Sequence, residues 1–125
     1  MQLQDETRRE ERLLQRDLRT VALFVDYYCQ KCHPDETKAP FELELPEWRE
    51  AHPGSLQVCA PCRKLLAHAA VKRIHCPLQP KPACKHCPSH CYHPAYRAQM
   101  REVMRVAGWG LVSGGRLDFL YHMLF

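Results

Sequence analysis

The sequence predicts a mostly α-helical protein: one small domain, residues 1–125, of three to four helices with two cysteine-rich metal-binding loops. Three observations lead to this fold class. Apolar residues recur at spacings of three and four in three separate segments. All 10 prolines lie between these segments or at their first turns. Eight cysteines and eight histidines gather near the segment ends, which indicates metal ligation in a chain short enough for a single domain.

The first predicted helix covers residues 6–28. Its apolar stripe and its charged residues occupy different faces, as in an amphipathic helix. The stripe consists of Leu14, Leu18, Val21, Val25 and Tyr28. Apolar residues become much denser after residue 20, so we expect the first turns to be exposed and the last three to be buried. Cys29 and Cys32 follow where this helix should end.

Residues 34–55 are predicted to form an exposed, irregular insertion. Four prolines interrupt this segment and a glycine closes it, which disfavours regular structure. Connections of this length without secondary structure are uncommon inside a compact domain. Apolar and acidic residues alternate over 41–45, so a short edge strand is the one element expected there.

Two further helices are predicted after the insertion. The second covers residues 60–75, with Pro61 in its first turn, where proline is tolerated. The third covers residues 94–108, and Gly108 should stop it because glycine commonly terminates helices. The tail, residues 116–125, is expected to form a short helix laid on the core.

The first cysteine set consists of two C-x2-C pairs. Its members are Cys29, Cys32, Cys59 and Cys62. A turn between two such cysteines lets both sulfurs face one ion, and four thiolates fill the tetrahedral coordination sphere of zinc. That sphere has no open position for catalysis, so we expect a structural zinc that joins the end of the first helix to the start of the second. His33 and His52 flank this set as alternative ligands, although such histidines more often form hydrogen bonds around a metal site or face solvent.

The second cysteine set is denser than the first. It consists of Cys76, Cys84, Cys87 and Cys91. These residues lie close together in the chain, so closing the loops around one metal centre costs little entropy. Zinc and an iron–sulfur cluster are both predicted cofactors here, although the spacing does not match the bacterial ferredoxin pattern. Four histidines around this set are alternative ligands or hydrogen-bond donors: His75, His86, His90 and His93.

Two other classes of function compete with a purely metal-binding role. The CAPC sequence of Cys59 and Cys62 stands before a predicted helix, as in thiol–disulfide oxidoreductases, although no βαβ pattern follows it. Charge is also uneven, because residues 1–50 carry a net −4 and residues 51–125 a net +8. A nucleic-acid or protein partner could therefore bind a row of arginines on the third helix, unless that row only faces solvent. The row consists of Arg97, Arg101 and Arg105.

Several classes of protein are disfavoured by the sequence. It contains no nucleophile elbow, phosphate-binding loop or dinucleotide fingerprint, so no catalytic residue is predicted and an enzyme is not the favoured interpretation. No apolar run is long enough to span a membrane. The first residues mix acids with arginines, unlike a secretory signal. We therefore expect a cytoplasmic protein whose reduced cysteines bind metal instead of forming disulfides.

Residues 84–108 resemble the signature of the YgbA-like, nitrous oxide-stimulated promoter family of small bacterial and archaeal proteins, with the sequence CKHCPSHCYHPAYRAQMREVMRVAG. The likeness extends to residues 59–77 and, more weakly, to residues 21–30. The family's description concerns the switching-on of a gene under nitrogen-oxide stress and names no activity. The chain departs from the family at Cys32, where members often carry histidine. The resemblance implies a cytoplasmic protein associated with nitric oxide or nitrosative stress.

The residues and the resemblance together favour a metal-binding protein of the nitrosative stress response, with metal–thiolate centres that act structurally or as a sensor. Nitric oxide attacks zinc thiolates and iron–sulfur clusters alike. Modification of Cys84, Cys87 or Cys91 would then eject or alter the metal and loosen the local fold. A zinc-stabilised adaptor and a CxPC thiol–disulfide oxidoreductase are the alternatives.

Overall fold

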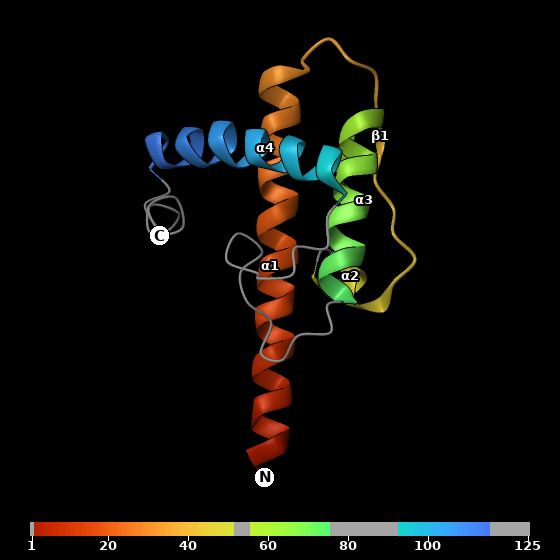
Figure 1. The fold of residues 1–125 in the computed structure, drawn as a ribbon, viewed down its shortest axis with the longest axis vertical. Helices are drawn as coiled ribbons and strands as arrows, with labels where there is room; N and C mark the ends of the chain where they lie inside the picture. The colour runs from red at the N-terminus through yellow and green to blue at the C-terminus, as the bar shows by residue number, and fades with distance from the viewer. Residues whose placement is uncertain (1, 52–55, 76–92, 116–125) are drawn as a thin grey trace.

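The computed structural model describes residues 2–51, 56–75 and 93–115. This part of the chain holds four helices and a two-stranded sheet, so the predicted mostly α-helical fold class is confirmed. Helix α1, Gln2–Cys32, runs the length of the molecule (Figure 1). Helix α3, Ala60–Ile74, packs along α1, and helix α4, Pro94–Ser113, crosses both of them.

Helix α1 extends beyond the predicted range of 6–28 at both ends. Its first turns are exposed and its second half is buried, as the rising density of apolar residues predicted. Leu18, Phe24 and Val25 are fully buried there. At its C-terminal end, α1 continues through Cys29 and Cys32 instead of stopping before them, which decides which side chains share a face there.

The segment predicted to be an exposed insertion contributes to the core, so that prediction requires correction. Strand β1, Lys38–Pro40, pairs antiparallel with strand β2, Gln57–Cys59. The strand therefore precedes the expected position of 41–45. Helix α2, Pro46–Ala51, follows it. Phe41 is buried edge-on against Trp48 of α2, with 5.1 Å between the ring centroids. The two aromatic side chains anchor this segment, because their burial removes a large apolar area from water.

Helix α3 matches its prediction closely and is tied to α1 by a charged contact. Arg73 of α3 forms an ion pair with Asp17 of α1. The Arg73 side chain is only 10% exposed, so this ion pair is well shielded from solvent. Leu65, Leu66, Ala69 and Ala70 form the buried face of α3, as predicted from their spacing.

Helix α4 continues past Gly108, which was predicted to stop it. Gly108 is buried inside the helix, and α4 ends only at Ser113. Gly110 instead allows a close approach of α4 to α1. A Cβ atom added to Gly110 would lie 2.3 Å from Oη of Tyr27 on α1. The space that a side chain would need at Gly110 is therefore filled by the Tyr27 ring. The predicted C-terminal helix, 116–125, lies outside the described residues.

Candidate metal centre

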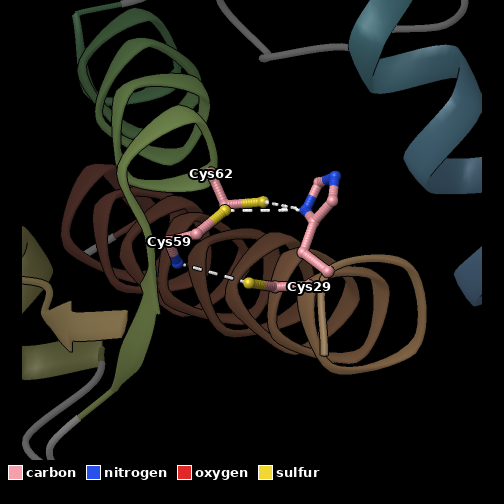
Figure 2. Close-up of side chains that lie close together, drawn as sticks. Cys29, Cys59 and Cys62 are labelled. Carbon is pink, nitrogen blue, oxygen red and sulfur yellow. Dashed lines mark hydrogen bonds between the residues drawn. The ribbon is translucent and has the colours of Figure 1, made fainter. Parts of the chain in front are cut away.

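Four potential metal ligands converge where the end of α1 meets β2 and the start of α3. Cys29 and His33 are one helical turn apart and share a face, since the His33 amide donates a hydrogen bond of 2.9 Å to the Cys29 carbonyl. Cys59 ends β2 and is the N-cap of α3, and Cys62 lies in the first turn of α3. The ligand atoms of all four residues lie within 4.8 Å of one another. Figure 2 shows the three cysteine side chains reaching into the same space.

The spacing of these atoms fits a tetrahedral metal ion. Nδ1 of His33 lies 3.5 Å from Sγ of Cys59 and 3.5 Å from Sγ of Cys62. A zinc ion with Zn–S bonds of about 2.3 Å and a Zn–N bond of about 2.0–2.1 Å separates sulfur from nitrogen by about 3.6 Å across a tetrahedral edge. Three sulfurs and one imidazole nitrogen are also a ligand set typical of zinc. The residues present therefore fit such an ion in their chemistry, and the distances from His33 to the two sulfurs fit it in geometry.

The three thiols of the site are buried and electrostatically unequal. Cys29, Cys59 and Cys62 are 0%, 1% and 3% exposed. Burial raises the pKa of Cys29, but hydrogen bonds from the Cys59 amide, the Cys59 side chain and Lys38 outweigh it, so the pKa falls below its ordinary value. The pKa of Cys62 is raised strongly, first by burial and then by its contact with Cys59 and the negative charge of Cys29. Without metal, Cys29 is thus the more acidic of these two thiols.

Cys32 is the predicted ligand that the structure does not bring into this group. It is exposed, whereas His33 is half-buried and faces the two sulfurs of α3 and β2. The prediction relied on a turn between Cys29 and Cys32 that would point both sulfurs at one ion. Because α1 continues through both cysteines, the residue four positions after Cys29 takes the place expected for Cys32. The i, i+4 spacing of Cys29 and His33 was the sequence signal for this ligand.

The second predicted ligand set lies outside the residues that the structure describes. This applies to Cys76, Cys84, Cys87 and Cys91, together with His86 and His90, so their assignment to zinc or an iron–sulfur cluster stays a prediction. Two of the neighbouring histidines are described. His75 is exposed at the end of α3. His93 is the N-cap of α4, and its Nδ1 accepts a hydrogen bond of 3.2 Å from the Ala95 amide.

The alternative of a thiol–disulfide oxidoreductase meets an obstacle in this geometry. The strand, turn and helix expected around CAPC are present as β2 and α3. However, the sulfurs of Cys59 and Cys62 belong to side chains that are almost fully buried, and no βαβ unit occurs in the described ranges. A disulfide enzyme needs an accessible thiolate to attack its substrate. The site is therefore better suited to holding an ion than to exchanging disulfides.

The predicted arginine row lies on the outer face of α4. Arg97, Arg101 and Arg105 are exposed, and Arg105 forms an ion pair with Glu102 one turn away. The structure assigns no nucleic-acid or protein partner to this row. Across the described parts of the chain, no helix is both long enough and apolar enough to cross a membrane.

Comparison with known proteins places the chain in a family. Residues 12–124 match the family described as nitrous oxide-stimulated promoter. The uncharacterized protein YgbA of Escherichia coli (strain K12) is 33% identical to it over 96 residues, which cover 76% of this chain. The match spans 65% of the length of that relative. No solved structure matches the chain. The protein therefore belongs to the YgbA-like, nitrous oxide-stimulated promoter family.

Proposed function

We propose that this protein holds a structural zinc ion at Cys29, His33, Cys59 and Cys62, and that it acts in the response to nitric oxide and related nitrogen oxides. The observation that carries the metal proposal is the position of His33 Nδ1, which lies 3.5 Å from each of two cysteine sulfurs. These separations are those of two ligands on one tetrahedral ion.

A structural role is favoured over a catalytic one by the closed ligand set. Four protein donors complete a tetrahedral sphere, whereas a catalytic zinc keeps one position for water or substrate. The donors also come from two stretches that are distant in sequence, namely the end of α1 with the residue that follows it, and the junction of β2 with α3. An ion bound by all four would join these elements. Metal-binding free energy would therefore contribute directly to the stability of the fold.

A role in nitrosative stress is supported by the family and by the chemistry of the ligands. The family's description refers to a promoter stimulated by nitrous oxide. We propose the same link to nitrogen oxides for this protein. Metal-bound thiolates are nucleophiles, and dinitrogen trioxide would nitrosate one by forming an S–N bond while its N–N bond breaks and nitrite leaves. The burial of Cys59 and Cys62 would slow this reaction at the described centre. The set of Cys76, Cys84, Cys87 and Cys91 therefore remains our proposed sensing site.

We also propose that the protein resides in the cytoplasm. The metal proposal is tested by metal analysis of protein purified without oxygen. Wild-type protein should contain zinc, and the Cys59→Ser/Cys62→Ser variant should contain one zinc fewer per chain. Cys32→Ser is the matched control, because it removes an exposed thiol from the same region, and it should retain the wild-type zinc content. Equal zinc contents in wild type and the double variant would contradict the proposal. Visible absorption would in addition report an iron–sulfur cluster at the second set.

A second candidate function is a zinc-stabilised adaptor that binds nucleic acid through α4. The observation that favours it is the exposure of all three arginines on one face of this helix. Binding to duplex DNA should weaken steeply with salt, because arginine–phosphate contacts release counterions. The Arg97→Gln/Arg101→Gln variant should bind the duplex more weakly, and its affinity should fall less steeply with salt. Binding that does not respond to salt or to these changes would exclude this function.

A further inference from the structure

Lys38 contacts three of the four ligand residues of the proposed metal centre. Its ammonium donates a hydrogen bond of 3.4 Å to Sγ of Cys29. The same ammonium donates a hydrogen bond of 2.7 Å to the carbonyl oxygen of His33. In the β1–β2 ladder, Lys38 is the register partner of Cys59. Lys38 belongs to the segment, residues 34–55, that was predicted from the sequence to be an exposed insertion.

The charge of the ligand set explains why a cation is needed at this position. Three thiolates around one divalent ion leave a net charge of −1. All three cysteines are buried, and an uncompensated charge in a buried site costs free energy because it has lost its hydration. The Lys38 ammonium brings the centre to electrical neutrality without occupying a coordination position.

We propose that Lys38 is the positioning residue that neutralises this centre and thereby sets its affinity for a divalent metal ion. The proposal rests on the proposed metal function. Lys38 acts through Cys29, whose sulfur also accepts a hydrogen bond of 3.3 Å from the Cys59 amide. Cys29 thus receives two N–H donors, and both come from the paired strands. Hydrogen-bonding partners of metal ligands orient the ligands and tune the metal, and their loss commonly lowers affinity by about 10- to 100-fold.

The test compares metal affinity in Lys38→Met, Lys38→Arg and the wild-type full chain. The probe is cadmium-113, whose NMR resonances distinguish one bound site from another while a chelator competes for the metal. We expect Lys38→Met to lower the affinity of this site by about 10- to 100-fold, and Lys38→Arg to restore most of it because arginine keeps the charge and the donors. Lys31→Met is the matched control, because Lys31 is an exposed lysine at the end of α1, and it should leave the affinity unchanged.

A second readout separates electrostatic tuning from a merely structural role. In cobalt(II)-loaded protein, loss of the N–H donor to sulfur should move the sulfur-to-metal charge-transfer bands of Lys38→Met to lower energy. Lys38→Gln retains a donor without the charge, and provides a second variant if Lys38→Met does not fold. If the uncharged variants keep the wild-type affinity and unchanged charge-transfer bands, the proposed role of Lys38 is overturned, but the metal centre is not. Failure of the wild type to bind cadmium at these ligands would overturn the metal centre itself, and this proposal with it.

Discussion

His33 supplies the only nitrogen among the four donors, and its replacement by alanine tests whether the ligand set is the one described. Structural zinc binding contributes about 10–16 kcal/mol in small zinc domains. Divided evenly over four donors, this is about 2.5–4 kcal/mol for each. His33→Ala should therefore lower zinc affinity by about 10²- to 10³-fold, since each 1.4 kcal/mol corresponds to about a tenfold change. The assay is competition with a chromophoric chelator at constant pH and ionic strength.

Cys32→Ser is the control for His33→Ala because the two residues are adjacent in the chain. Cys32 is exposed and lies outside the ligand group, so its loss should leave the affinity unchanged. His33 also packs edge-on against Tyr28, at 5.3 Å between ring centroids, so the stability of the metal-free variants should be compared by urea unfolding. If Cys32→Ser loses as much affinity as His33→Ala is expected to lose, or if His33→Ala binds zinc like wild type, the ligand assignment is refuted.

Three further predictions concern the helix packing and the titration of the site. Arg73→Met should destabilise the protein to urea by about 1–3 kcal/mol, because it breaks a shielded ion pair to α1, whereas Arg105→Met, at an exposed pair, should cause no measurable loss. Gly110→Ala should lower the thermal midpoint because overpacking costs about 1–3 kcal/mol, while Gly114→Ala should not, since its new methyl meets no atom closer than 3.5 Å; equal midpoints would contradict the close helix crossing. Zinc binding should release a proton from Cys62, whose pKa is raised by burial, so the apparent affinity should fall as the pH is lowered. Calorimetry in buffers of different ionisation enthalpy measures this proton release, and a buffer-independent enthalpy would count against it.

Much of the helical framework could be predicted because its signals are local. Spacings of three and four place the buried stripes of α1 and α3, and the prolines at the starts of α3 and α4 mark where those helices begin. The stop predicted at Gly108 was wrong, because α4 continues through this glycine to Ser113. A glycine can end a helix or permit a close approach to a neighbouring element. Gly110 does the second, because the Tyr27 ring of α1 fills the space that a side chain would need there.

The segment before β2 was harder to predict because its anchors act over long distances. Its prolines and charges indicate a solvated connection when read locally. Phe41 and Trp48 nevertheless bury their rings together, and Lys38 pairs with a residue 21 positions later in the ladder. That the whole chain forms one domain stays a prediction.

The candidate site could be predicted for three of the four ligands that the structure brings together. Cys29, Cys59 and Cys62 were expected in one set, because C-x2-C pairs are typical of zinc sites. The fourth donor depends on where α1 ends. A helix that stopped before Cys29 would favour a turn and Cys32, whereas a helix that continues favours the i, i+4 partner, His33. Sequence periodicity places helix ends only to within a few residues, and a shift of this size is enough to exchange the ligand.

The most direct test of the metal centre is a proton–cadmium-113 correlation spectrum of the full chain loaded with cadmium. One cadmium resonance should correlate with the β-protons of Cys29, Cys59 and Cys62 and with the ring protons of His33. This result would establish all four donors on one ion. A spectrum in which the β-protons of Cys32 correlate with that resonance in place of His33, or in which the three cysteines share no common resonance, would contradict the account.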